Sequence, residues 1–237
     1  MGVAAPFGWE SLAPRQLLPC GEEQISIRGG SQTGLKMKRE IIDTTGFNSA
    51  AILPFELRLK DFEIAMQDVY DFFFDVNKLL SGKGLHRLDD MLRPAAMSGI
   101  ISDMLTASMA KHARALVENR HFNGHPDLIL RGKYPNDSVK AGEHGVEIKS
   151  TRKHGGAVDT HGAREQWMCV FVYATDHETQ PADSRAAMRF TEVYLAHVVQ
   201  ADFRRNARGE LGTRTATLDR AGVKKLRASW IYRLPGK

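Results

Sequence analysis

Cysteine and long apolar runs are the scarcest features of this sequence of 237 residues. Its two cysteines are Cys20 and Cys169, and no Cys-x-x-Cys spacing occurs, so cysteines alone cannot build a tetrahedral zinc site. No stretch approaches the roughly 18 apolar residues of a membrane span, and the opening MGVAAPFGWE lacks the basic head and apolar core of a secretory signal. These absences favour a protein of the reducing cytoplasm with no membrane partner.

Several catalytic motifs are also missing. No GxxxxGK[ST] phosphate loop, GxSxG nucleophile elbow or HExxH zinc motif occurs. Among the nine histidines, His121 and His125 lie four residues apart and His154 and His161 flank a loop, but no Cys/His set has metal-ligand spacing. Histidine metal chemistry is therefore the less favoured alternative, since single histidines mostly lie at surfaces or in hydrogen bonds.

The composition is that of a folded protein, with 42% hydrophobic and 26% charged residues. A chain of this length suits one well-buried core. Residues 1–35 contain many glycines and prolines, and we expect an irregular arm there with one short strand at 24–28. We expect a single domain over 36–237, divided into a helical part (54–119), a hairpin and sheet (125–200) and a basic segment (201–237).

The spacing of apolar residues predicts the order of the structural elements. Steps of three and four predict helices over 54–80 and 96–119, the second just after Pro94. A further short helix is expected over 217–227, with Thr217 as its N-cap. Alternating or continuous apolar runs predict strands at 127–130, 145–149, 167–173, 190–199 and 229–234. This order implies a mixed sheet flanked by helices, an α/β fold that leans towards α+β.

Positive charge is concentrated at the end of the chain. The formal net charge is +5, but residues 201–237 hold ten Lys or Arg against three acids, a net charge of +7. The remainder of the chain carries −2. A basic region on a nearly neutral body favours a polyanionic partner, because phosphate contacts supply most nonspecific affinity for nucleic acid. The alternative is an ordinary solvated basic surface.

Three ionisable residues lie on the two strands of the predicted hairpin. Asp127 begins the first strand, and Glu147 and Lys149 lie two residues apart on the second. Because residues i and i+2 of a strand point to the same face, Glu147 and Lys149 project together while Val146 and Ile148 enter the core. Turn residues separate the strands, so Asp127 can reach that same face. We predict that the three side chains converge.

Such a cluster has the parts for hydrolysis of a phosphodiester. Two adjacent carboxylates repel each other unless a cation lies between them, and hard oxygen ligands at this density suit Mg²⁺. A metal-bound water can be deprotonated near neutral pH, and the metal stabilises charge that develops on phosphate. Lys149 would hold or help deprotonate the attacking water. The alternative is a surface hairpin that carries an exposed cross-strand ion pair.

The segments HPDLIL and GVEIKSTRK, which contain these residues, resemble the PD-(D/E)xK nuclease superfamily, and within it the type II restriction endonucleases. The resemblance covers mainly residues 96–175. It implies a restriction-endonuclease-like core, a magnesium requirement and often a homodimer on palindromic duplex DNA. When the roles of the family's motif residues are carried over to this sequence, the resemblance implies that Asp127 and Glu147 are metal ligands and that Lys149 is the catalytic lysine. Many relatives add an acid from the helix before the hairpin, and Glu118 is the residue that we assign to this role.

The resulting expectation is a Mg²⁺-dependent, site-specific endonuclease of double-stranded DNA. The loop after the second hairpin strand and the basic segment are expected to hold the DNA. The side chains expected to do so are Arg152, Lys153, Arg164, Lys224 and Lys225. Two alternatives stay open: a repair or recombination nuclease of the same superfamily, and a non-catalytic basic DNA-binding protein.

Overall fold

The computed structural model describes residues 37–156, 158–160, 162–205 and 215–236. The expected N-terminal arm, with its short strand at 24–28, lies outside the described residues, as does the 206–214 part of the basic segment. None of the described helices is long and apolar enough to cross a membrane.

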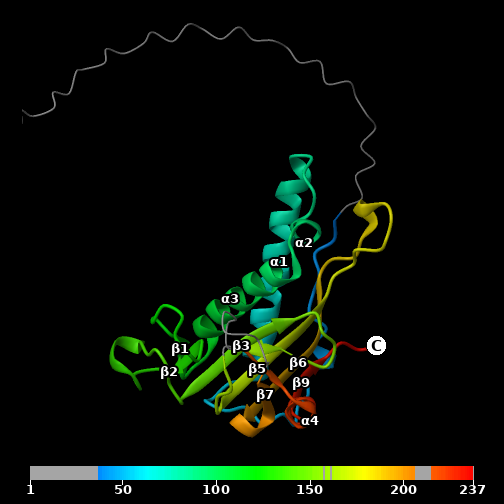
Figure 1. Ribbon diagram of the computed structural model, residues 1–237. Helices are drawn as coiled ribbons and strands as arrows, with labels where there is room; N and C mark the ends of the chain where they lie inside the picture. The colour runs from blue at the N-terminus through cyan, green and yellow to red at the C-terminus, as the bar shows by residue number, and fades with distance from the viewer. Residues whose placement is uncertain (1–36, 157, 161, 206–214, 237) are drawn as a thin grey trace, which may run out of the picture. The chain divides into compact units, whose positions relative to one another are not determined.

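Two long helices form one layer of the fold (Figure 1). Helix α1 (Leu59–Gly82) places its buried side chains at steps of three and four, as the helical prediction over 54–80 requires. The short helix α2 (Leu88–Met91) leads into α3 (Pro94–His112), which has Pro94 as its first residue. Proline has no backbone N–H, but at the first position of a helix this loses no hydrogen bond, because a first-turn N–H has no partner within the helix.

Helix α3 ends earlier than the sequence predicts. The expected helix runs to 119, but α3 stops at His112 and the chain continues into strand β1 (Leu116–Glu118). The guanidinium of Arg58 donates a hydrogen bond to the carbonyl oxygen of His112 at 3.1 Å, which satisfies one of the carbonyls left free at the helix end. Leu116 fits the helical spacing equally well, so the boundary is marked by long-range contacts: this hydrogen bond and the pairing of Leu116 with Leu130 of β2.

The central sheet has six strands in the order β1-β2-β3-β5-β6-β9. It is mixed, because β3 and β5 are parallel and the other neighbours are antiparallel. The prediction of a mixed central sheet flanked by helices is therefore confirmed. After β1, its strands are β2 (Leu128–Leu130), β3 (Gly145–Thr151), β5 (Gln166–Ala174), β6 (Arg189–Val198) and β9 (Trp230–Arg233).

A second, three-stranded sheet was not predicted. Its order is β4-β8-β7, with strands β4 (Asp159–Thr160), β7 (Phe203–Arg205) and β8 (Ala216–Leu218). Helix α4 (Arg220–Ala228) follows β8. The prediction that Thr217 caps this helix is wrong, since Thr217 lies inside β8 and the Asp219 carboxylate accepts the hydrogen bond from the Gly222 N–H at 2.8 Å.

Four short 3-10 turns complete the described elements. They are η1 (Thr44–Gly46), η2 (Pro135–Asp137), η3 (Ala182–Ser184) and η4 (Gln200–Asp202).

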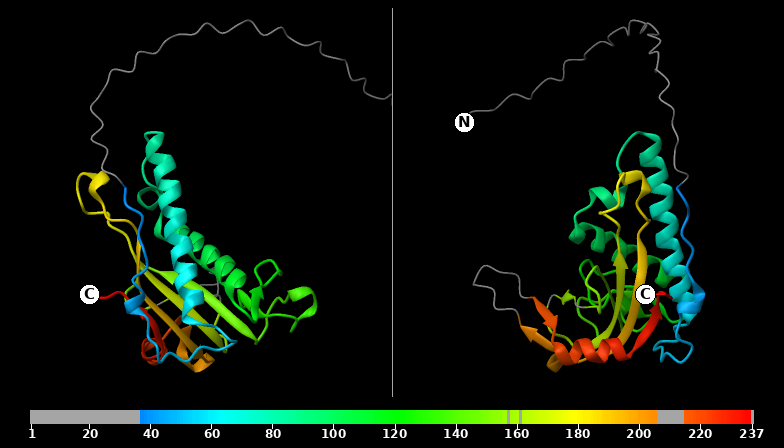
Figure 2. Two further views of the ribbon diagram at one scale, coloured as in Figure 1. Left: turned by 180° about the vertical axis from the view of Figure 1, so that it is seen from behind. Right: turned by 90° about the vertical axis from the view of Figure 1, so that its right-hand side faces the viewer.

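The two faces of the central sheet are covered by different elements (Figure 2). Helices α1 and α3 pack on the face that carries Ile148, Cys169 and Phe171. Helix α4 and β8 pack on the opposite face, against Val170 and Tyr194. Cys169 is a buried free thiol, as expected from its apolar neighbours, and burial raises its pKa well above the ordinary value. Both faces of the sheet are thus covered. Polar side chains of the sheet reach solvent at the edge of a strand.

Candidate active site

The edge of β3 becomes accessible halfway along the strand. Strand β2 pairs with β3 at Gly145 and Val146, and β3 continues to Thr151 beyond the end of that pairing. Asp127 directly precedes β2, and its Oδ2 accepts a hydrogen bond from the Ile148 N–H at 2.7 Å. The carboxylate thus replaces β2 as the hydrogen-bond acceptor for β3 beyond the end of their pairing, so the Ile148 N–H does not lack a partner.

The structure brings Asp127, Glu147 and Lys149 together at this edge. Lys149 Nζ lies 2.5 Å from Glu147 Oε1 and 3.9 Å from Asp127 Oδ2. Glu147 and Lys149 share a face of β3, and Asp127 reaches that face because it lies one residue beyond the pairing of Leu128 with Val146. The ammonium group of Lys149 is therefore the cation that lies near both carboxylates.

His125 adds a fourth polar group to the cluster. Its Nδ1 lies 3.2 Å from Glu147 Oε2, and because a carboxylate only accepts, this contact requires a proton on Nδ1. Glu147 is 2% exposed, and each of its two oxygens has a partner: Oε2 contacts His125 and Oε1 contacts Lys149. Such pairing is what makes a buried carboxylate tolerable.

The three principal groups have shifted pKa values. Burial, together with the charge of Glu147, raises the pKa of Asp127 to about 6. Burial opposes ionisation of Glu147, but the hydrogen bond from His125 and the charge of Lys149 outweigh it and hold its pKa at about 2. Burial likewise opposes the charge of Lys149, yet the two carboxylates raise its pKa. At neutral pH, Lys149 is therefore protonated and Glu147 ionised.

A cleft of about 810 Å³ opens beside the cluster. Its walls come from the N-terminal half of α3, from the 123–127 segment and from β3. Ser150 on β3 donates a hydrogen bond to the carbonyl oxygen of Ser98 on α3 at 2.8 Å, which holds helix and strand together along the cleft. Asp103 on α3 and Asp159 on β4 also line it, and both are exposed.

Glu118 does not reach this cleft. It lies in β1 rather than at a helix end, and its partner Leu128 pairs in turn with Val146. Side chains paired across strands share a face, so Glu118 points away from the face of Glu147. The assignment of Glu118 as the helix acid fails because it relied on a helix that extends to 119. Asp103 does lie on α3 and lines the cleft, and it belongs to the same predicted helix, but no sequence pattern singles it out.

Asp127 and Glu147 are the residues that could hold a metal ion. Within the described residues, no group of three or more His, Cys, Asp and Glu is placed to form a protein cage for a metal. Mg²⁺ does not need such a cage, since it usually binds one or two carboxylates and keeps several waters. The pair of carboxylates, one of them facing the cleft, fits that preference.

The basic residues expected to contact DNA lie in two places. Arg152 and Lys153 are exposed in the loop after β3, and the charge of Arg164 lies close enough to oppose protonation of Lys149. Lys224 is exposed on α4, where it lines a hollow of about 530 Å³. Three further cations line this hollow: Arg204, Arg220 and Arg227.

Lys225 differs from its neighbour Lys224. Its ammonium group forms an ion pair with the buried carboxylate of Asp202, which also accepts a hydrogen bond from the Val199 N–H at 2.8 Å. The Lys225 charge is thus engaged in holding α4 to the η4 turn, whereas Lys224 is directed to the hollow.

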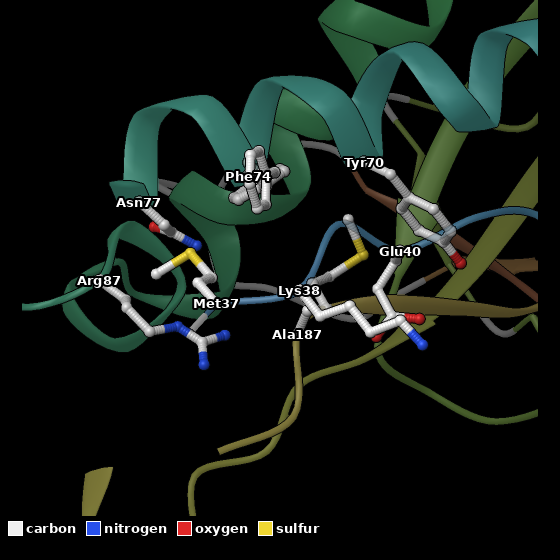
Figure 3. Close-up of a pocket in the computed structure, with 10 residues that line it drawn as sticks. Met37, Lys38, Glu40, Tyr70, Phe74, Asn77, Arg87 and Ala187 are labelled. Carbon is white, nitrogen blue, oxygen red and sulfur yellow. The ribbon is translucent and has the colours of Figure 1, made fainter. Parts of the chain in front are cut away.

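A much smaller pocket lies between α1 and the segment at Met37–Glu40 (Figure 3). Its volume is about 20 Å³, room for about one water molecule. Tyr70 and Phe74 of α1 form part of its wall. Its size excludes it as a site for a substrate.

The fold and site together define a mixed α/β protein whose six-stranded mixed sheet carries a cluster of two carboxylates, a lysine and a histidine at the open edge of β3. Comparisons of the chain with protein-family models, with curated proteins and with solved structures found no match. The assignment of a function therefore rests on the residues and geometry of the chain itself.

Proposed function

We propose that this protein is a Mg²⁺-dependent endonuclease that hydrolyses phosphodiester bonds of double-stranded DNA at specific sites, with a restriction-endonuclease-like core. The observation that carries the proposal is the convergence of Asp127, Glu147 and Lys149 beside an open cleft. A buried acid, a partly buried acid and an amine are costly to assemble side by side. Strongly shifted pKa values in a cleft are typical of catalytic groups.

Each member of the cluster has a role that its geometry supports. Asp127 and Glu147 would hold Mg²⁺, which supplies activation of a water and stabilisation of phosphate charge. Lys149, protonated at neutral pH, donates hydrogen bonds that orient the attacking water and offset the charge on the phosphate. His125 orients Glu147 by its contact with Oε2.

The remaining parts of the proposal concern the partners. The cations at Arg152 and Lys153 and those around Lys224 would bind phosphates on either side of the cut. Cutting both strands of a symmetric site calls for a two-fold symmetric homodimer. We place the protein in the cytoplasm, where the Cys169 thiol stays reduced.

Incubation of the purified protein with plasmid DNA and Mg²⁺ tests the proposal. A fixed set of cut positions is expected, and Lys149→Ala and Asp127→Ala should each slow the cutting by at least roughly 10²-fold. Lys133→Ala, which removes an exposed lysine from the same hairpin connection, is the matched control and should cut normally. Cutting that follows DNA structure instead of sequence would favour the repair alternative. Salt-sensitive binding with no Mg²⁺-dependent cutting would leave a non-catalytic DNA-binding protein.

A further inference from the structure

A second hollow adjoins the catalytic cleft. It measures about 710 Å³, within the range of roughly 300–1,000 Å³ typical of ligand pockets. It lies over the C-terminal half of α3, over β1 and over the 119–122 segment. Figure 1 shows the β1–β2 hairpin at this end of α3.

The two hollows follow one another along the same elements. On α3, the cleft ends at Thr106 and the second hollow begins at Ala107. On the loop between β1 and β2, the second hollow ends at Phe122 and the cleft begins at Asn123. The linings of the two hollows therefore adjoin at two places, Thr106–Ala107 on α3 and Phe122–Asn123 in the loop.

The lining of the second hollow is basic and aromatic. Lys111, Arg120 and Arg131 contribute exposed cations from three different segments. Two acids, Glu118 and Asp137, also line it, and one oxygen of the Asp137 carboxylate accepts a hydrogen bond from the Gly132 N–H at 2.7 Å. The three cations exceed the two acids by one charge, which suits a phosphate-bearing ligand.

Phe122 is the unusual member of this lining, because it is a large apolar side chain that is 87% exposed. Its loop is firmly held. The side-chain amide of Asn119 donates to the carbonyl oxygens of Pro126 and Val139, at 3.0 and 2.8 Å, and its Oδ1 accepts from the His121 N–H at 3.1 Å. The hydrogen-bonded loop thus exposes the phenyl ring of Phe122 to solvent. Because the loop is already ordered, its conformational entropy should fall little when a ligand binds.

We propose that this hollow holds the nucleic-acid strand on one side of the scissile phosphate, with Phe122 stacked on an exposed base. Lys111, Arg120 and Arg131 contact the backbone phosphates of the same strand. The combination of an aromatic face with a basic groove is the one that binds bases and backbone together. This inference rests on the proposed function and deepens it. It says where the substrate strand is bound beside the cleft and which side chain contacts its base.

The exposed base has two sources, an unpaired strand and a base unstacked from a duplex. Two oligonucleotides that carry 2-aminopurine distinguish them: a fully paired duplex, and the same duplex with an unpaired extension. Binding is measured by fluorescence anisotropy and stacking by quenching of the 2-aminopurine, in Mg²⁺ and in a Lys149→Ala background that removes the catalytic ammonium.

Phe122→Ala is expected to weaken binding by roughly five- to a hundred-fold and to abolish quenching, as loss of one base–aromatic stack does. Phe122→Trp, which keeps an aromatic ring, should bind and quench like the parent. Ile52→Ala is the matched control, because Ile52 is 85% exposed and lies far along the chain, and it should bind like the parent. Quenching with the extended DNA alone assigns the base to an unpaired strand, and quenching with both assigns it to an unstacked duplex.

Two outcomes overturn the inference. If Phe122→Ala binds and quenches like the parent while wild type cuts DNA, the strand path is wrong and the proposed function stands. If wild type binds no DNA, both fail. If binding depends on Phe122 but wild type cuts nothing, the strand path holds and the nuclease proposal fails.

Discussion

Two regions of this molecule are rich in charge, and they treat it in opposite ways. At the edge of β3, Glu147 is buried and its charge is met by Lys149 and His125 at close range. Around α4, the cations of Arg220 and Lys224 are exposed and line an open hollow. The first region pairs its largely buried charges with one another, and the second exposes its cations to solvent.

This difference suggests a division of roles, with catalysis at the β3 cluster and DNA affinity at the α4 cations. A buried ion is stable only when its partners compensate for lost hydration, so each member of such a cluster depends on the others. Exposed cations cost little to place and act nearly independently on a polyanion. Substitutions should therefore have large, non-additive effects at β3 and small, additive effects at α4.

Lys149→Ala should produce the largest effect. Loss of the ammonium is expected to slow DNA cleavage by roughly 10²- to 10³-fold, because it removes a donor aimed at developing charge. DNA affinity should change little, since one of many phosphate contacts is lost. Single-turnover cleavage and anisotropy on the same DNA measure the two effects. A variant that cuts at the wild-type rate would contradict the assignment of the catalytic lysine.

Asp127→Asn should raise the Mg²⁺ concentration needed for half-maximal cleavage by roughly tenfold or more, because a neutral amide is a weaker ligand for a hard cation. Removal of divalent ions with a chelator should abolish cutting by wild type, and added Mg²⁺ should restore it. Glu143→Gln, at an exposed carboxylate just before β3, is the control and should keep the wild-type Mg²⁺ requirement. An unchanged Mg²⁺ requirement in Asp127→Asn would remove this residue from the metal site.

The contrast also explains what could be predicted from the sequence. Alternation of apolar and charged residues at 145–149 and the turn residues before it were enough to predict the hairpin, and register then brings Asp127, Glu147 and Lys149 together. These are local rules, and the site depends on them.

The parts that failed depend on contacts between distant segments. The end of α3 is marked by Arg58, which lies 54 residues before His112, and no local pattern reveals it. Strands β4, β7 and β8 have two or three residues each, too few for a periodic signal. No sequence pattern makes a prediction for Phe122, whose loop is held by hydrogen bonds between Asn119 and Val139 across the hairpin.

Lys224→Ala tests the exposed region. It is expected to weaken DNA binding by a few-fold and to reduce the slope of log affinity against log salt by about 1, as loss of one phosphate contact does. Cleavage of saturated DNA should stay unchanged. A salt titration of binding measures the slope. If Lys224→Ala slows cleavage at saturation, then α4 acts in the chemistry and the separation of the two regions is wrong.

Lys225→Ala is the matched control for Lys224→Ala and should have the smallest effect on DNA. Its ion pair with Asp202 is half-exposed, so its loss should lower the free energy of unfolding by only about 0.5–1 kcal/mol. Burial opposes ionisation of Asp202, but Lys225 and the Val199 N–H outweigh it and lower its pKa. This carboxylate therefore contributes stability above its unfolded pKa of 3.8 and loses it as the pH falls through the lower folded value. Urea unfolding at pH 7 and pH 3 should show the difference between wild type and Lys225→Ala shrinking in acid, and a difference that grows in acid would rule out this pairing.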